Sequence, residues 1–283
     1  MAGGTLAYAT QRAPVPWWSF TKTAIAAAIL TLVRDGELEL DAPFEGRGFS
    51  LRLLLQHRAG IANYGGLPAY HAAVAAGEAP WSAEELLERC QADALLFAPG
   101  TGFAYSNIGY LMLRRMLEQV CDCPLGDALR LLVLAPLDIE ATLLSEKLPP
   151  GRTMSGLRAG YDPGWVYHGL LCGPLDQAAL LLRRLMSGDF LPASLREEMC
   201  AGVGVGPAMP DRPFRQPAYG LGTMVDLAAG FVGHTGGGPD SAIAVYFSPA
   251  TQRAAAVFGP SDAADAVETR AATLILDDGE ANE

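Results

Sequence analysis

The sequence predicts an α+β fold in which helices flank an antiparallel sheet drawn from both ends of the chain. Helical apolar patterns alternate with Gly and Pro breaks from about residue 50 to 200, whereas short β-type runs follow residue 202 and another occupies residues 5–10. This order is typical of a segregated α+β arrangement with a mostly helical insertion. We expect residues 1–49 and 212–283 to form the α/β part and residues 50–211 the helical region, together one compact unit.

A buried helix is expected directly after Ser19. Residues 23–33 are apolar on every side, which indicates a helix surrounded by protein. Arg34 suits the last turn of this helix and Gly36 its C-cap. Ahead of it, residues 5–10 favour a short strand that the following prolines would end.

The remaining elements are predicted from capping residues, turn residues and apolar spacing. Helices are expected at residues 50–57, 82–90, 108–120, 125–134 and 176–186. Strands are expected at residues 219–226, 230–236, 241–247 and 254–258, with a glycine-rich hairpin turn at 236–240. A last helix at residues 263–276 has enough apolar residues on one side to pack against this sheet.

The composition describes a globular protein with few classes of macromolecular partner. Of the 283 residues, 50% are hydrophobic and 18% charged, and the formal net charge is −11. This excess of acidic residues argues against nucleic acid or an anionic membrane as partner, because both attract clustered Lys and Arg. Residues 1–6 lack the features of a signal peptide, and the apolar run at 23–33 is shorter than the roughly 20 residues that span a bilayer. We therefore predict a soluble, cytoplasmic protein.

Ser19 and Lys22 form the first candidate site. Residues three apart share one face of a helix, so the Lys22 amine can reach the Ser19 hydroxyl near a helix N-terminus that carries a positive field. This arrangement is that of an activated nucleophile. The alternative is an ordinary Ser N-cap with a solvated lysine, which the pair alone does not exclude.

Two later segments carry further candidates. Tyr105, Ser106 and Asn107 place a phenol, a hydroxyl and an amide side by side at the end of a loop; the alternative is a turn in which Asn107 caps the next helix and Tyr105 packs in the core. Residues 233–237 form a strand interrupted by glycines. Such glycines mark the close approach of another backbone, for example an added substrate, or else a hairpin with a bulge.

Taken in order, these segments resemble the motifs of a known superfamily. Ser19-Phe20-Thr21-Lys22, Tyr105-Ser106-Asn107 and His234-Thr235-Gly236 match the S-x-x-K, Y-x-N and K/H-T-G motifs of the serine β-lactamases and penicillin-binding proteins, in their class C, DD-peptidase and esterase branch. The likeness extends between the motifs and covers about residues 17–249. It implies a β-lactamase/transpeptidase-like fold.

The resemblance implies catalytic roles for three residues. Ser19 would be the nucleophile that forms an acyl-enzyme, and Lys22 would take its proton, helped by burial that lowers the pKa of the amine. Tyr105 would act as the partner base or as a proton relay to the leaving group. No cofactor is implied. The five cysteines, odd in number and without C-x-x-C spacing, are expected to be reduced, and no metal site is predicted.

Substrate and oxyanion binding would fall to five further residues, which are Asn107, His234, Thr235, Gly236 and Gly237. Asn107 would hold the acyl-side amide of the substrate, and His234 would support proton transfer or bind a substrate carboxylate. The backbone N–H groups of Ser19 and Gly237 would form the oxyanion hole. The other three histidines, His57, His71 and His168, are expected to pack in the core or lie on the surface.

The sequence thus predicts a serine hydrolase acting on an amide or ester bond of a small molecule or short peptide, most like a DD-peptidase or D-aminopeptidase. A carboxylesterase of the same fold and a non-catalytic binding protein are the alternatives. The chain departs from the resemblance at its N-terminus, where only 18 residues precede Ser19. We therefore expect the N-terminal part of the sheet to be shortened, leaving an edge that the second subunit of a homodimer could cover.

Overall fold

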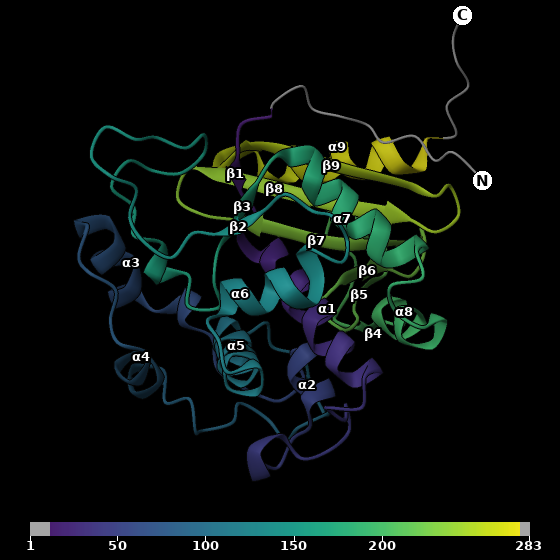
Figure 1. Cartoon of the computed structure of the whole chain (residues 1–283), viewed down its shortest axis with the longest axis horizontal. Coiled ribbons are helices and arrows are strands. Elements are labelled where there is room, and N and C mark those ends of the chain that lie inside the picture. Colours follow the sequence, from purple (N-terminus) through teal and green to yellow (C-terminus); the bar gives the residue numbers. More distant parts are fainter. Residues whose placement is uncertain (1–11, 278–283) are drawn as a thin grey trace, which may run out of the picture.

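The computed structural model describes residues 12–277, which contain a larger and a smaller antiparallel sheet (Figure 1). The larger sheet has the order β4-β5-β6-β7-β8-β9, with strands Val203–Gly204, Pro217–Tyr219, Met224–Asp226, Phe231–Gly237, Ser241–Ser248 and Arg253–Pro260. The smaller sheet has the order β1-β3-β2, with β1 at Val15–Pro16, β2 at Thr142–Leu143 and β3 at Leu171–Gly173. The strand predicted at residues 5–10 lies outside the described residues.

Helices surround the sheets and fill the middle of the chain, as the sequence predicts. They are α1 Thr21–Arg34, α2 Leu51–Leu55, α3 Pro68–Ala76, α4 Ala83–Arg89, α5 Asn107–Cys121, α6 Leu125–Leu129, α7 Leu175–Ser187, α8 Ala193–Cys200 and α9 Ala264–Leu276. A π-helical turn, Arg130–Leu134, continues α6. The sequence patterns did not predict α3 or α8. Across residues 12–277, no helix is both long and apolar enough to cross a membrane.

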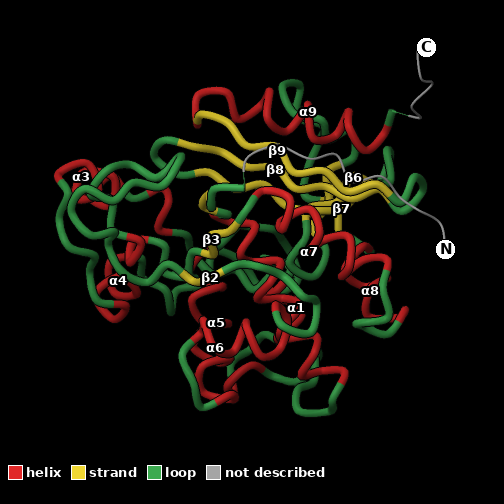
Figure 2. The backbone as a smooth tube through the Cα atoms, turned by 45° about the horizontal axis from the view of Figure 1, so that its top comes forward, coloured by secondary structure: helices red, strands yellow, loops and turns green. Residues whose placement is uncertain are grey.

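The larger sheet has α9 on one side and α1 and α7 on the other (Figure 2), and a separate hydrophobic cluster lies on each side. Successive side chains of a strand point to opposite faces. Ala244 and Tyr246 of β8 therefore pack with α9, whereas Ile243, Val245 and Phe247 join the larger cluster that contains α1 and α7. This alternation explains why β8 is buried along its whole length.

The helix α1 lies at the centre of the larger cluster and contacts both α5 and α6. Residues 24–30 are all 0% exposed, as their uninterrupted apolar pattern predicts. Four Ala residues in this stretch, at positions 24, 26, 27 and 28, allow close packing against the neighbouring elements. Because α1 is enclosed on all sides, Lys22 in its first turn is buried as well.

One predicted strand, residues 219–226, is wrong as a single element. The structure divides it into β5 and β6, joined by a turn at residues 220–223. Gly222 has a φ of 74° and would place an added Cβ only 2.3 Å from the Cβ of Ala26 in α1. Thr23 of α1 also donates a hydrogen bond of 2.9 Å to the Gly222 carbonyl. The turn thus forms where the chain contacts α1. Strand propensity depends on neighbouring residues in the sequence and could not predict this contact.

We expect Gly222→Ala to destabilise the protein by about 2–4 kcal/mol, because it combines a left-handed backbone with a clash against Ala26. The measurement is urea-induced unfolding followed by circular dichroism. Gly36→Ala is the matched control: its φ is 80°, yet an added Cβ meets nothing within 4 Å. The control should cost about 1 kcal/mol, from backbone strain alone. Equal losses for both variants would contradict the packing argument.

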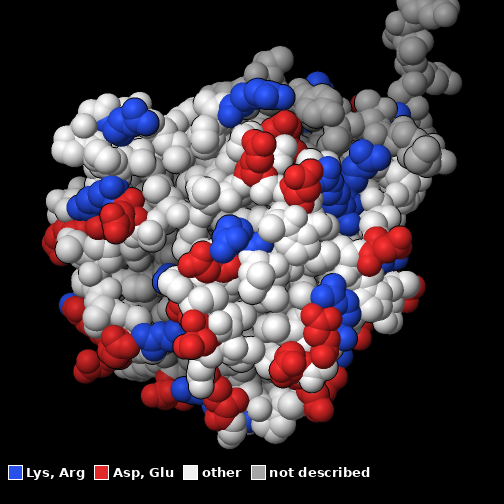
Figure 3. All heavy atoms as spheres, viewed as in Figure 1, with Lys and Arg blue, Asp and Glu red and all other residues white. Residues whose placement is uncertain are grey.

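On the face in view in Figure 3, acidic and basic side chains alternate rather than gather by sign. Among the described residues, several charged side chains pair with each other, for example Arg89 with Glu85 at 2.7 Å and Arg158 with Asp240 at 2.8 Å. This face therefore presents no broad basic surface of the kind that attracts nucleic acid.

Candidate active site

Ser19 lies in a 3-10 turn, Trp18–Phe20, which immediately precedes α1. It is therefore not part of the α-helix itself, which begins at Thr21. Trp18 has a φ of 44°, a left-handed conformation that is uncommon for a bulky residue and that costs on the order of 1–3 kcal/mol. Neighbouring elements hold this conformation. The backbone N–H of Trp17 donates to the Leu171 carbonyl at 2.8 Å, and the Trp18 indole donates to Ser241 Oγ at 2.9 Å. The turn that carries Ser19 is thus fixed between the two sheets.

Lys22 lies beside Ser19 and is completely buried. Its Nζ is 3.1 Å from Ser19 Oγ, 2.7 Å from Asn107 Oδ1 and 3.2 Å from His168 Nε2. The Lys22 nitrogen also lies 5.0 Å from the centroid of the Tyr105 ring. The structure therefore brings together Ser19, Lys22, Tyr105 and Asn107, which the sequence predicts as one site.

The surroundings of Lys22 favour its neutral form. Burial lowers the pKa of Lys22 well below that of an ordinary lysine. Burial also lowers the pKa of His168, and the nearby Lys22 lowers it further, so this imidazole is neutral too. A neutral amine has two N–H groups and one lone pair. It can donate to Asn107 and His168 while its lone pair accepts the Ser19 hydroxyl, which is the geometry of a general base.

The loop that precedes α5 orients Tyr105 and Asn107. Ser106, not Asn107, caps α5, because its Oγ accepts from the Gly109 N–H at 2.9 Å. Asn107 is held from the other side: its Nδ2 donates to Asn63 Oδ1 at 3.1 Å, which turns its Oδ1 towards Lys22. Burial raises the pKa of Tyr105, and the nearby Ser19 hydroxyl opposes that rise. Tyr105 is accordingly a neutral phenol, and it borders the same cavity as Ser19.

The strand β7 carries the third predicted segment along the other side of Ser19. An added Cβ on Gly236 would lie 2.7 Å from the Cβ of Trp18 and 2.8 Å from the backbone nitrogen of Ser19, so β7 approaches Ser19 closely only because this residue is glycine. The approaching backbone is the chain's own Ser19 turn. Thr235 and Gly237 border the space in front of Ser19.

His234 lies behind this surface and is 0% exposed. Its Nε2 is 2.8 Å from the Tyr219 hydroxyl, and its Nδ1 contacts the carbonyl of Thr235. Burial and, secondarily, Lys22 lower the pKa of His234 to about 3. His234 is therefore neutral, with both ring nitrogens engaged, and a direct contact of this side chain with substrate stays a prediction from the sequence.

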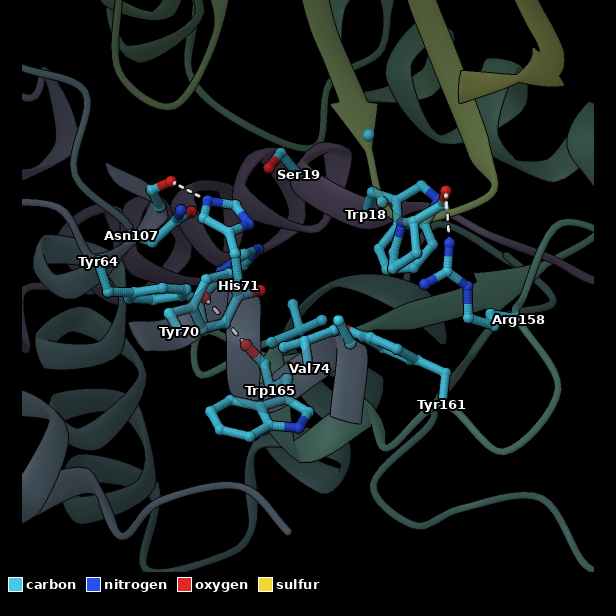
Figure 4. Close-up of a pocket in the computed structure, with 17 residues that line it drawn as sticks. Trp18, Ser19, Tyr64, Tyr70, His71, Val74, Asn107, Arg158, Tyr161 and Trp165 are labelled. Atoms are coloured by element: carbon cyan, nitrogen blue, oxygen red, sulfur yellow. Dashed lines mark hydrogen bonds between the residues drawn. The ribbon is translucent and has the colours of Figure 1, made fainter. Parts of the chain in front are cut away.

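Two cavities meet at Ser19, and Gly237 and Gly238 border both. The first, here called the aromatic cavity, has a volume of about 460 Å³ and contains Asn107 and His168 beside five aromatic side chains, Trp18, Tyr64, Tyr70, Tyr161 and Trp165. Figure 4 shows Ser19 above Tyr70 and Trp165, with Arg158 at the far side. The second, here called the apolar cavity, has a volume of about 550 Å³ and contains Tyr105, Thr235 and mostly apolar side chains. The site can therefore hold groups on both sides of a reacting bond.

Sequence reasoning missed two residues of this site, His168 and Asn63. His168 was expected to be a packing or surface residue, but its imidazole contacts the amine of Lys22. It lies 146 positions away in the sequence and reaches Lys22 because β3 pairs with β1, just ahead of Ser19. His57 does pack in the core, where its Nδ1 accepts from the Ser106 N–H at 3.1 Å.

Comparison with known proteins identifies the family. The family model described as Beta-lactamase matches residues 4–280. No curated protein matches the sequence. Among solved structures, the chain is similar to a D-stereospecific amidohydrolase from Streptomyces sp., with a TM-score of 0.76 and 23% identity over 95% of this chain and 88% of the other.

Two further structures share the fold. The D-amino acid amidase from Ochrobactrum anthropi SV3 has a TM-score of 0.74 and 22% identity over 89% of this chain and 80% of the other. The octameric penicillin-binding protein homologue from Pyrococcus abyssi has a TM-score of 0.72 and 20% identity over 93% of this chain and 65% of the other. The predicted α+β fold and the family resemblance are confirmed: this chain belongs to the Beta-lactamase family.

Proposed function

We propose that this protein is a serine hydrolase that forms an acyl-enzyme on Ser19 and cleaves an amide or ester bond. The observation that carries the proposal is the buried Lys22 amine, 3.1 Å from Ser19 Oγ and bonded otherwise to uncharged groups. A structural lysine in a core would be expected to pair with a carboxylate. An amine kept neutral beside a hydroxyl is suited to take its proton.

Acylation then follows from the positions of the groups. Lys22 accepts the Ser19 proton as Ser19 Oγ attacks the carbonyl carbon of the substrate, and the negative charge that develops on the carbonyl oxygen is stabilised by the backbone N–H groups of Ser19 and Gly237. The bond to the leaving group breaks as Tyr105 delivers a proton to it. Tyr105 recovers that proton from Lys22, whose nitrogen lies near its ring.

Deacylation reverses these proton movements with water as the nucleophile. Tyr105 or Lys22 takes a proton from the attacking water, the ester bond to Ser19 Oγ breaks, and the proton returns to Ser19. The product is the free carboxylic acid. Asn107 acts in both steps by holding the Lys22 amine with its Oδ1, while Asn63 fixes the orientation of its amide.

The proposed proton path indicates which cavity holds the leaving group and which holds the acyl group. Tyr105 borders only the apolar cavity, so a leaving group that receives its proton lies there, whereas the acyl group occupies the aromatic cavity beside Asn107. Aromatic side chains favour an apolar or aromatic acyl group. The names of two proteins of the same fold, a D-stereospecific amidohydrolase and a D-amino acid amidase, support an amide of a D-configured residue as one substrate. A DD-peptidase and a D-aminopeptidase are the two specific activities that this proposal includes.

Labelling of the nucleophile tests the proposal. The pure protein, incubated with a fluorophosphonate probe and separately with a fluorescent penicillin, should gain the mass of one adduct, and peptide mapping should locate it on Ser19. Ser19→Ala should abolish the adduct. Ser261→Ala, which changes another serine bordering the apolar cavity, is the matched control and should label normally. Folded protein that forms no adduct with either probe would instead support a non-catalytic binding protein.

A further inference from the structure

The apolar cavity offers a leaving group very little charge. Most of the side chains around it are apolar, and the larger ones are Phe103, Val205, Met209, Phe214, Met224 and Ile243. Among the described residues that border it, only Arg212 and Glu268 are ionised side chains. Whether the cavity can accept a charged group therefore depends on the state of this one pair.

Arg212 and Glu268 neutralise each other. Arg212 Nε donates to Glu268 Oε2 at 2.7 Å, and Nη2 donates to Oε1 at 3.0 Å, which is a two-point contact between planar groups. Exposed fractions of 25% for Arg212 and 9% for Glu268 keep water from weakening the pair. The guanidinium also lies over the Phe214 ring, 5.1 Å from its centroid, and near two methionine sulfurs. Its donors are thus largely used before any substrate enters.

No other cation faces this cavity among the described residues that border it. His234 lies in β7, whose residues 235–237 border the cavity, yet its two ring nitrogens contact Tyr219 and the Thr235 carbonyl, and it is neutral. A substrate carboxylate placed here would lie beside the Glu268 carboxylate and would lose its hydration without gaining a free cation.

We propose that the leaving group of the substrate is an uncharged, apolar alcohol or amine, and that the Arg212–Glu268 pair excludes leaving groups that carry a carboxylate. This inference rests on the proposed function of Ser19. It separates an amidase or esterase from a carboxypeptidase, since release of a C-terminal amino acid would place a carboxylate in the apolar cavity. The alkyl and aromatic walls of the cavity supply the favourable contact for a neutral group.

Two matched esters test the proposal. N-acetylphenylalanine is esterified, as each enantiomer, to glycolamide and to glycolate, so that the leaving alcohols differ only in an amide against a carboxylate. Rates are divided by those of hydroxide-catalysed hydrolysis. The wild type should cleave the glycolamide ester with a kcat/KM at least about 10-fold higher, as one unfavourable charge contact requires. Equal or faster cleavage of the glycolate ester would overturn the proposal, as would turnover of neither ester by protein that labels on Ser19.

Variants of Arg212 and Glu268 test whether this pair causes the preference for the uncharged leaving group. Glu268→Gln should release the charge of Arg212 and raise kcat/KM for the glycolate ester about 10-fold, mainly through KM. Glu268→Asp, the matched control, keeps the pair and should keep the wild-type preference. Adding Arg212→Gln to Glu268→Gln should remove the gain. A Glu268→Gln protein that labels on Ser19 but gains nothing on glycolate would overturn the proposal.

A second variant tests the same proposal in case Glu268→Gln does not fold. Val205→Lys adds a cation from a half-buried position at the same cavity and should produce the same gain on the glycolate ester. An absent gain in labelled Val205→Lys protein would count against the proposal equally. These results are distinct from failure of the proposed function, because that failure appears as an unlabelled Ser19 in the wild type.

Discussion

Lys22→Met should lower kcat/KM for the glycolamide ester by about 10³-fold, within the range that a general base contributes. The thioether has a length similar to that of the amine but cannot accept the Ser19 proton. Lys22→Arg should be as inactive, because a guanidinium stays protonated. The measurement is the initial rate of ester hydrolysis, with folding checked by circular dichroism. Lys147→Met is the control: this lysine is exposed and pairs with Asp162 at 3.7 Å, so its variant should keep the wild-type rate.

The same amine should set the pH dependence of the wild type. The proposed mechanism requires neutral Lys22, and burial lowers its pKa, so the neutral form persists to a lower pH than in an ordinary lysine. Activity should therefore be lost as pH falls through the lowered pKa and be retained above it. A profile that stays low until pH reaches the range of an exposed lysine would contradict the role of Lys22 as the base.

His168→Leu should lower kcat/KM by about 100-fold and move the acid limb of the pH profile to lower pH. The rate falls because the Lys22 amine loses the acceptor at 3.2 Å that orients its lone pair, and small misplacements of a catalytic group cost about this much. The limb moves because an acceptor stabilises the protonated amine, so its removal lowers the pKa of Lys22 further. The pH profile of kcat/KM is the measurement.

Two companion variants separate positioning from packing at His168. His168→Gln can present its amide oxygen where Nε2 lies and should restore most of the rate together with the wild-type acid limb. His71→Gln changes the other histidine at the aromatic cavity, whose Nε2 contacts the Gly65 carbonyl and not Lys22, and should leave the limb in place. Equal profiles for wild type and His168→Leu would show that His168 only fills space.

Local patterns predicted the parts of this fold whose causes are local. The apolar run of α1, the serine caps at Ser50 and Ser82, and the strand β8 all follow from side chains close in sequence. The site residues Ser19, Lys22, Tyr105 and Asn107 were found because their spacing matches known motifs. The structure brings these four together.

What sequence reasoning missed depends on contacts between distant segments. The turn at Gly222 forms against α1, and His168 reaches Lys22 only through the pairing of β1 with β3. The glycines of β7 left two readings open, the close approach of another backbone or a hairpin with a bulge. At Gly236 the structure shows a close approach, and the partner is the turn of Trp18 and Ser19. The spacing of residues in the sequence does not show which distant segment a residue will contact.

The position of α9 has a consequence for how substrate range can change in evolution. Ala264 and Glu268, four residues apart on one face of α9, border the apolar cavity, while Ala271 and Ile275 anchor the helix to the opposite side of the sheet from α1. If the leaving group occupies this cavity as proposed, substitutions on the cavity-facing side of α9 would alter which leaving groups are accepted without disturbing the amine, phenol and amide around Ser19. Under that proposal, selectivity and bond cleavage can diverge independently among proteins built on this plan.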